Sequence, residues 1–381
     1  MARIILGSYM VRYPLGGMLS WVLQFLVGFK RLGHEIYFVE KYGYPNSCYD
    51  PTKETMTDDC TYGVTVLEKL LDSVGLKNTW CFVDRSEEYH GISKQNIEEI
   101  FRTADMFIDM GTHGSWATEA EKTGMRVLID GEPAFTQIKM ANNLSAGIEQ
   151  PQYDQYFTTG KNINTEYSTS PTAGIKWKYL YHPVQVDMFP VVPCPKNAFY
   201  STVMNWQSHE PIEYNGKIYG QKNIEFQKFI DLPKHVSVGM QVAVSGKKLP
   251  IDTLKKSGWD VADARLMTIS FERFCQYIRE SRGEFSVCKN VFVANQSGWF
   301  SDRSAAYLAS GRPVIMQDTG FSRHLPCGEG LFAFNTLEEA KMAIEEIESD
   351  YELHSKMARH IAIEYLDTGI VLKSFLKELG I

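Results

Sequence analysis

The stretch Ser297–Phe321, SGWFSDRSAAYLASGRPVIMQDTGF, contains a loop, a helix, a strand and a second loop in direct succession. Ser301 suits the position before the helix, because its hydroxyl can accept a hydrogen bond from a free first-turn amide. Gly311 provides the left-handed stop that ends a helix, and Pro313 prevents its continuation. The apolar run 314–316 is typical of a buried parallel strand. The stretch therefore predicts one helix–strand unit of an α/β protein.

Polar residues stand at both ends of this unit. Ser301 and Arg303 lie at the start of the helix, where free amides and the positive end of the dipole favour an anion. Asp318, Thr319 and Gly320 follow the strand, at the edge where open α/β sheets bind ligands. The pattern indicates a seat for a phosphate or diphosphate. The alternative is an ordinary helix–strand unit with a capped helix and a solvated arginine.

The beginning of the chain shows the same alternation. An apolar run at 4–6 is followed by a loop at 9–17, an amphipathic helix and a second strand at 36–39. Gly16 and Gly17 in the loop either let backbone amides approach a ligand closely or form a tight turn. The dinucleotide fingerprint GxGxxG is absent, so this loop does not indicate a dinucleotide site.

The segment SDRSAAYLASGRPVIMQDTG resembles the nucleotide-sugar-binding segment of GT-B glycosyltransferases of the group 1 type, a GT4-like superfamily. The glycine pair and the run Gly33-His34-Glu35-Ile36 also fit that family, so the resemblance extends over most of the chain. It implies an α/β fold of GT-B type, with two Rossmann-like domains facing each other across a cleft. Many retaining members carry two glutamates eight positions apart. Gly298 and Ala306 occupy those positions here, so the donor contacts of those glutamates are not transferred to this chain.

A stretch rich in proline and polar residues, 145–196, separates two alternating αβ series. We therefore expect an N-terminal Rossmann-like acceptor domain at 1–190 and a C-terminal Rossmann-like donor domain at 191–360. The resemblance implies that the remaining helical segment, 361–381, crosses back to the first domain.

Three residues are candidates for catalysis because each follows a predicted strand. His113 lies in a glycine-flanked loop, and the resemblance implies that a histidine there faces the transferred sugar. Asp130 and Glu132 could accept the proton of an acceptor hydroxyl, or could serve only in turn formation and helix capping.

Further polar residues are candidates for contacts with the nucleotide. Lys222 and Arg282 could neutralise phosphate charge, and Glu284 could accept hydrogen bonds from ribose hydroxyls; each could equally be an ordinary surface charge. The sequence contains no strict Asp-x-Asp motif, which favours metal-independent transfer with no bound metal. We expect a nucleoside-diphosphate sugar as co-substrate and no separate cofactor.

The bulk properties restrict the class of protein. The chain has 381 residues, a formal net charge of −7, and seven cysteines without a CxxC pair. The negative charge argues against general binding of nucleic acid, and the cysteine spacing suggests neither a zinc site nor a disulfide framework. The sequence shows no signal peptide and no apolar run of the length of a transmembrane segment, so we expect a cytoplasmic protein.

The resemblance to GT-B enzymes, together with the missing Asp-x-Asp motif, implies a metal-independent glycosyltransferase. It would move a sugar from a nucleoside-diphosphate sugar to a hydroxyl or amine of a small molecule or glycan. A sugar-nucleotide epimerase of the same fold and a non-catalytic nucleotide-sugar-binding protein are the alternatives. The sequence leaves the sugar, the base and the acceptor open.

Overall fold

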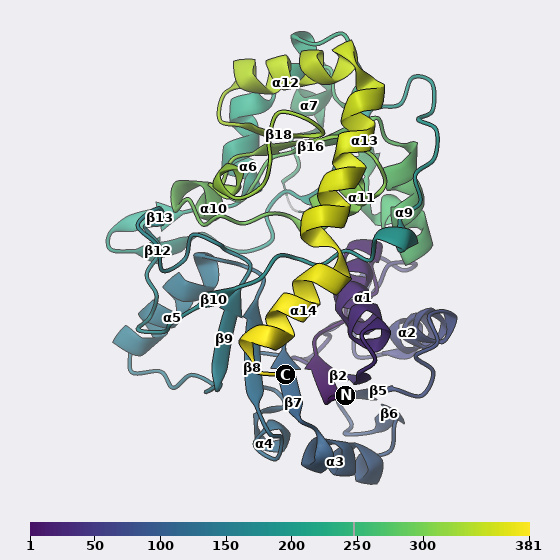
Figure 1. Ribbon diagram of the computed structural model, residues 1–381, viewed down its shortest axis with the longest axis vertical. Helices are drawn as coiled ribbons and strands as arrows, with labels where there is room; N and C mark the ends of the chain where they lie inside the picture. The colour runs from purple at the N-terminus through teal and green to yellow at the C-terminus, as the bar shows by residue number, and fades with distance from the viewer. Residues whose placement is uncertain (247) are drawn as a thin grey trace.

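Two parallel sheets organise the chain in a computed structural model that describes residues 1–246 and 248–381 (Figure 1). The first sheet has the strand order β10-β9-β8-β7-β1-β2-β5-β6, with parallel pairing except between β5 and β6. Its strands are β1 (Arg3–Gly7), β2 (Glu35–Lys41), β5 (Trp80–Val83), β6 (Tyr89–Gly91), β7 (Met106–Asp109), β8 (Arg126–Asp130), β9 (Gln155–Thr158) and β10 (Lys178–Tyr179). Its helices are α1 (Gly16–Arg31), α2 (Thr61–Ser73), α3 (Lys94–Thr103), α4 (Ala117–Ala120) and α5 (Phe135–Ser145).

The second sheet has the order β15-β14-β11-β16-β17-β18, all parallel. Read in chain order this is 3-2-1-4-5-6, the order of doubly wound nucleotide-binding sheets, with its switch point between β11 and β16. Its strands are β11 (Tyr200–Asn205), β14 (Met240–Ser245), β15 (Asp260–Asp263), β16 (Gly283–Ser286), β17 (Val314–Gln317) and β18 (Leu331–Phe334). The helices around it are α6 (Lys222–Phe226), α7 (Ile251–Lys256), α8 (Ala264–Met267), α9 (Phe271–Glu280), α10 (Asn290–Ala294), α11 (Asp302–Ala309), α12 (Leu337–Ser349) and α13 (Tyr351–Ile361).

The helix–strand unit predicted from Ser297–Phe321 is present as α11 and β17. Gly311 ends the helix with a φ of +66°, and β17 is buried along its whole length. Burial on both faces explains why this strand is a continuous apolar run rather than an alternating one.

The first sheet ends at Tyr179 and the second begins at Tyr200, so the predicted division at residue 190 falls in the segment between them. Two short hairpins lie outside the large sheets and were not expected from the sequence. They are β3 (Cys48–Asp50) with β4 (Thr55–Thr57), and β12 (Ile212–Tyr214) with β13 (Lys217–Tyr219).

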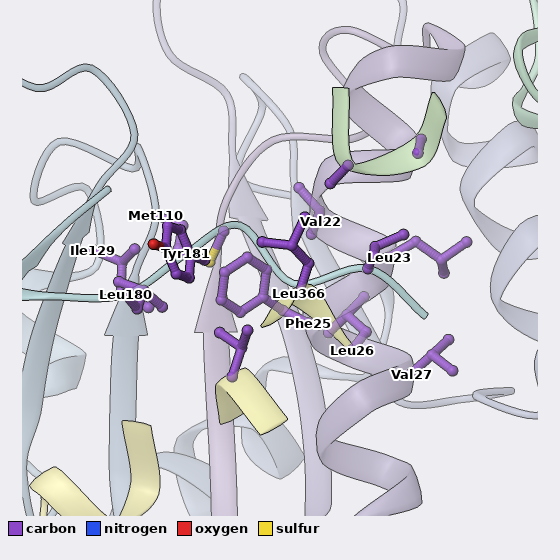
Figure 2. Close-up of a cluster of buried hydrophobic side chains, with 14 of the residues drawn as sticks. Val22, Leu23, Phe25, Leu26, Val27, Met110, Ile129, Leu180, Tyr181 and Leu366 are labelled. Atoms are coloured by element: carbon purple, nitrogen blue, oxygen red, sulfur yellow. The ribbon is translucent and has the colours of Figure 1, made fainter. Parts of the chain in front are cut away.

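The chain returns to the first sheet at its C-terminal end. After α13, a π-helical turn (Ala362–Leu366) redirects the chain into α14 (Thr368–Glu378), which descends alongside α1 in Figure 1. Phe375 of α14 packs 4.8 Å from Phe157 and 6.1 Å from Phe29, measured between ring centroids. Figure 2 shows Leu366 in the same buried cluster as Val22, Phe25 and Leu26 of α1. The core of the first domain is therefore completed by the last helix of the chain.

None of the helices in the described ranges combines the length and the apolar character that crossing a membrane would require.

Candidate functional site

The carboxyl ends of the two sheets meet at an ion pair between the domains. Glu132 follows β8 of the first sheet, and Lys289 follows β16 of the second. The Lys289 Nζ donates to both carboxylate oxygens of Glu132, at 2.5 and 2.6 Å. The side chain of Lys289 is 12% exposed and that of Glu132 is 38% exposed. The pair marks the place where a ligand would contact both domains, because interdomain clefts are favoured ligand sites.

Two aromatic residues of the first domain, Tyr9 and Trp21, lie near Glu132. Burial raises the pKa of Tyr9 to about 12, and the negative charges of Glu132 and Asp302 act in the same direction. Tyr9 stands 6.2 Å from Trp21 of α1, between ring centroids. Asp302 is the first residue of α11, so the start of that helix faces the first domain at this point.

His182 is fixed in one tautomer beside this cluster. The indole Nε1 of Trp21 donates to the Nδ1 of His182 at 3.2 Å. An indole nitrogen can only donate, so Nδ1 accepts and the neutral ring carries its proton on Nε2. Burial lowers the pKa of His182, while Asp302 and Glu132 oppose that shift. A buried neutral imidazole with a defined donor atom therefore lies at the interdomain site.

His113 is exposed in a loop that Asp109 holds in place. The Asp109 carboxylate accepts hydrogen bonds from the backbone amides of Gly111, Thr112 and Gly114, and from the Thr112 hydroxyl. His113 has a φ of +53°, a left-handed conformation that few side chains adopt without support. Among the residues that the structure describes, its imidazole has no hydrogen-bond partner, so the ring is available to a ligand.

His209 approaches His113 from the second domain. Burial lowers the pKa of His209, and the positive charges of Lys289, Lys139 and His113 lower it further. Its ring stacks on Phe135 of α5, with 5.1 Å between centroids. The β12–β13 hairpin extends beside α5 in Figure 1, and the Asn142 side chain donates to the Glu213 carbonyl there at 2.8 Å. The hairpin that follows His209 therefore packs against α5 of the first domain.

Asp130 holds the backbone and is not free to act on an acceptor. Both of its oxygens accept hydrogen bonds: Oδ1 from the Glu132 amide and the Thr136 hydroxyl, and Oδ2 from Gln137 and Thr158. Burial raises the pKa of its carboxyl, while these hydrogen bonds oppose that shift. This arrangement favours the turn and capping role over the role of a base, and it corrects our expectation for Asp130.

Arg303 fills the space between diverging strands at the switch point of the second sheet. β11 and β16 pair only near their beginnings, at Tyr200 with Gly283 and at Ser201 with Glu284 within the described chain. Beyond that point the guanidinium of Arg303 donates to the Val203 carbonyl at 2.8 Å and to the Ser286 hydroxyl at 2.7 Å.

Glu284 is the charge partner of Arg303. The Arg303 Nε donates to the Glu284 Oε1 at 2.5 Å, and the Glu284 side chain is fully buried while that of Arg303 is 13% exposed. Both residues thus hold the sheet together, and Glu284 is neither the ordinary surface charge nor the free ribose contact that the sequence offered as alternatives. Its second oxygen, Oε2, is buried without a hydrogen-bond partner in the described structure.

Lys222 is a buried lysine in the same region. It is the first residue of α6 and is 8% exposed. Burial lowers its pKa to about 7, and the positive charges of Arg303 and Lys289 act in the same direction while Glu284 opposes them. It forms no ion pair with a carboxylate within residues 1–246 and 248–381. A bound anion would therefore pair with the Lys222 ammonium, which has no carboxylate partner in the described structure.

The loop after β17 uses its polar groups internally. Asp318 accepts from the Gly320 amide at 2.8 Å and from the Ser322 hydroxyl at 2.7 Å, and the Thr319 hydroxyl donates to the Trp299 carbonyl at 2.6 Å. A Cβ on Gly320 would lie 2.4 Å from the Asn162 amide nitrogen. The first domain thus packs directly on this loop, and the Gly320 amide is not free for a phosphate.

Ser301 precedes α11 as predicted, but within the described structure its hydroxyl makes no capping hydrogen bond. Its side chain is buried beside the helix start that faces the first domain. Ser301 therefore remains a candidate ligand contact rather than a helix cap.

The two glycines at the start of α1 have different surroundings. A Cβ on Gly16 would lie 2.4 Å from the Ser270 carbonyl oxygen and 2.5 Å from the Phe274 Cβ, both in the second domain. The Gly16 amide also donates to the Thr268 carbonyl at 2.6 Å. A Cβ on Gly17 would meet no described atom within 4 Å. Gly16 serves contact between the domains, which corrects its assignment to the ligand, whereas Gly17 is open to one.

Arg282 is at the wrong end of the sheet for the site. It precedes β16, while ligands bind beyond the carboxyl ends of parallel strands. Its guanidinium donates to both oxygens of Glu348, at 3.0 and 2.8 Å, and stacks 3.7 Å from the Tyr351 ring centre. Our assignment of Arg282 to phosphate binding was wrong.

Several residues of the site were not among the sequence candidates. Lys289 and His209 belong to the second domain, so their approach to Glu132 depends on how the domains meet. His182 follows β10 of the first sheet and was missed as well. Tyr9 and Trp21 belong to the first βα unit, and their position after β1 is the one signal that the sequence contained.

Comparisons with known proteins were made at the level of sequence and of structure. No family model matches the sequence, and no curated protein matches it. An alpha-glucosyltransferase in complex with UDP and a 13-mer DNA has a TM-score of 0.63 at 10% identity, with 100% of both chains covered. HepE from Anabaena, in complex with UDP and glucose, has a TM-score of 0.58 at 9% identity, again over 100% of both chains.

Sucrose-phosphate synthase from Thermosynechococcus elongatus has a TM-score of 0.56 at 12% identity, covering 100% of this chain and 99% of its own. These similar structures are GT-B glycosyltransferases and match over the whole chain. At such identities the likeness concerns the fold, and it confirms the predicted α/β architecture. The chain therefore has the GT-B fold, with two Rossmann-like domains that face each other across the site around Glu132 and Lys289.

Proposed function

We propose that this protein is a glycosyltransferase that moves a sugar from a nucleoside-diphosphate sugar to a hydroxyl or amine of a small molecule or glycan. The observation that carries the proposal is the buried Lys222 at the switch point of the second sheet. Its ammonium has no carboxylate partner in the described chain, and Arg303 and Lys289 add positive charge around it. A diphosphate supplies the missing negative charge in the place where doubly wound sheets bind nucleotides.

Leaving-group stabilisation is the chemistry that these cations support. Glycosyl transfer places negative charge on the departing diphosphate, and fixed cations in a site with little water stabilise that charge. Lys222 and Lys289 are the residues that we assign to this role, with Ser301 and Gly17 as further contacts. The similar structures in complex with UDP make a uridine nucleotide the first donor to test.

Acceptor activation is assigned to the first domain. The imidazole of His113 is free of protein partners within the described residues and lies across from His209. Glu132 is the alternative base, but it must first be released from Lys289, which a diphosphate competing for that lysine would achieve. With a net charge of −7, the protein is better suited to a small-molecule or glycan acceptor than to DNA.

The deciding experiment measures nucleotide release from a panel of nucleotide sugars, with and without candidate acceptors. Acceptor-dependent release of the nucleoside diphosphate is the expected result. Conversion of the donor to a second nucleotide sugar without release would indicate an epimerase. Binding without turnover would indicate a non-catalytic binding protein. Either of these two outcomes would contradict the proposal.

The variant Lys222→Met tests the observation that carries the proposal. It keeps the length of the side chain and removes the charge, so we expect at least about tenfold weaker binding of UDP, as for loss of one charge-assisted hydrogen bond. Lys255→Met is the matched control, because Lys255 is an exposed lysine of α7 in the same domain. Equal UDP affinity in both variants would remove Lys222 from the site.

A further inference from the structure

Three side chains with metal-binding atoms converge on the first domain, outside the site described above. Cys60 is the residue before α2, Asp84 follows β5, and His90 lies on β6. The thiol sulfur, one carboxylate oxygen and a ring nitrogen all lie within 4.8 Å of one another. These residues come from three consecutive elements around the β5–β6 edge of the sheet, and the proposed glycosyl transfer uses none of them.

The distances approach those of a tetrahedral metal site. The His90 Nε2 is 2.9 Å from the Asp84 Oδ2 and 3.7 Å from the Cys60 Sγ. Around zinc, with bonds of about 2.0–2.3 Å to nitrogen, oxygen and sulfur, such atoms stand roughly 3.3–3.6 Å apart. Lengthening the distance between Nε2 and Oδ2 by about 0.4 Å would bring that pair to coordination spacing, and the sulfur lies within 4.8 Å of both atoms.

The arrangement does not fit a nucleophilic triad. In such a triad the nucleophile and the carboxylate use opposite nitrogens of the imidazole. Here the sulfur and the carboxylate oxygen both face the same atom, Nε2 of His90. Two atoms beside one imidazole nitrogen suit a metal ion shared by all three side chains better than a proton relay, which needs both nitrogens.

Asp84 is oriented for this role by its own turn. Its Oδ1 accepts from the backbone amides of Ser86 at 2.8 Å and Glu88 at 3.0 Å, which leaves Oδ2 directed toward His90. Hydrogen bonds of this kind fix the direction of a ligating carboxylate. The side chains of His90 and Asp84 are 26% and 17% exposed, so solvent reaches these two residues, while Cys60 is buried.

We propose that Cys60, Asp84 and His90 bind one divalent transition-metal ion, with zinc as the best match, and with a solvent molecule as the fourth ligand. A thiolate and a carboxylate together neutralise the two positive charges, and sulfur with imidazole is a ligand set that zinc favours. On binding, the Cys60 thiol releases its proton to solvent. The imidazole coordinates through Nε2 and keeps its proton on Nδ1.

The site would stabilise the acceptor side of the interdomain site. Cys60 directly precedes α2, and Gly63 in the first turn of α2 packs on the loop after β1: a Cβ there would lie 2.0 Å from the Val11 carbonyl oxygen. The same loop contains Tyr9 and Arg12. A metal at Cys60 would thus fix the helix that supports this loop.

The test uses the full chain after removal of metal with a chelator, followed by equilibrium dialysis against zinc chloride. We expect one bound zinc per chain at micromolar free zinc, with affinity lowered at least about tenfold in Cys60→Ser and in His90→Gln. Cys327→Ser and His235→Gln are the controls, since these exposed residues lie in the second domain, and they should bind zinc as the wild type does.

Cobalt substitution supplies a second readout that does not depend on the stability of a variant. Cobalt bound by the wild type should give the near-ultraviolet absorption of a thiolate-to-cobalt transition, which Cys327→Ser keeps. Absence of that absorption, less than half an equivalent of bound zinc, or equal zinc affinity in folded Cys60→Ser would each overturn the proposal. If Cys60→Ser or His90→Gln fails to fold, Asp84→Asn is measured in its place. This variant keeps the shape of the side chain and should likewise bind zinc more weakly.

Discussion

At the scale of single residues, His113 of the site has an imidazole without a hydrogen-bond partner among the described residues. Asp109 fixes the loop around His113, and the structure assigns the imidazole itself no partner among the described residues. Partial desolvation by the surrounding protein lowers the pKa of His113 although its side chain is accessible, so the ring is neutral and able to accept a proton near neutral pH. This combination suits a general base or a donor of a hydrogen bond to the sugar.

We expect His113→Ala to lower kcat at least about tenfold while the fold stays intact, because a positioned base contributes about 100- to 10,000-fold in rate. Steady-state kinetics with the best donor and acceptor measures this, with circular dichroism to check the fold. His235→Ala is the control for loss of a histidine. Unchanged kcat and KM in His113→Ala would make Glu132 the next base to test, because Asp130 is occupied by its own hydrogen bonds.

Lys222 should make binding of the nucleotide depend on pH. Its pKa of about 7 in the free protein means that the ammonium loses its proton as the pH rises above 7. A diphosphate favours the charged form, so binding above pH 7 must take up a proton, and affinity should fall by up to about tenfold per pH unit. Calorimetry with UDP from just below pH 7 to about pH 9 measures the slope. A slope that is the same in Lys222→Met would show that another group is responsible.

At the scale of the elements, helix α1 begins with two glycines, and of these two only Gly16 contacts the second domain. We expect Gly16→Ala to lower the free energy of unfolding by about 1–3 kcal/mol, since the new methyl group overlaps Ser270 and Phe274. Gly17→Ala is its matched control and should be neutral or stabilising by up to about 1 kcal/mol, because alanine favours a helix and the space is open. Urea unfolding of both variants distinguishes them. Equal free energies of unfolding for the two variants would mean that close packing at Gly16 does not contribute to stability.

The divergence of β11 from β16 makes Arg303 a structural residue, contrary to what its position in the helix predicted. We expect Arg303→Ala to cost about 3–5 kcal/mol in free energy of unfolding, because Glu284 would be left buried without its charge partner. The double variant Arg303→Met with Glu284→Gln should lose less than the sum of the two single variants. If Arg303→Ala unfolds like the wild type but no longer binds UDP, the phosphate-binding interpretation of Arg303 is restored.

At the scale of the whole molecule, the site is assembled from both domains and its cations come from side chains. Lys222 and Lys289 supply positive charge where a diphosphate would lie, so transfer should not need a divalent metal. We expect turnover to persist in excess chelator. Loss of turnover that magnesium or manganese restores would contradict this prediction. Turnover measured in Cys60→Ser separates this test from the zinc proposal, because a metal at Cys60 stabilises the fold and takes no part in transfer.

The sequence determined the local structure around the site. Local features depend on neighbouring residues and are therefore visible in the linear sequence. Examples are the apolar run 314–316, the helix stop at Gly311, and the alternation of helices and strands on both sides of residue 190. Because parallel strands place their carboxyl ends on one edge, the sequence could also place His113 and Glu132 at the edge where such sheets bind ligands.

Tertiary structure alone decided which of the candidate charges are free. Arg303 and Glu284 neutralise each other across the switch point, Arg282 pairs with Glu348 at the far edge, and Glu132 meets Lys289 only where the domains touch. The same holds for Cys60, Asp84 and His90, whose spacing of 24 and 6 residues follows no metal-binding motif. The energy of a charged side chain depends on its burial and its partners in three dimensions, and those partners lie far away in the sequence.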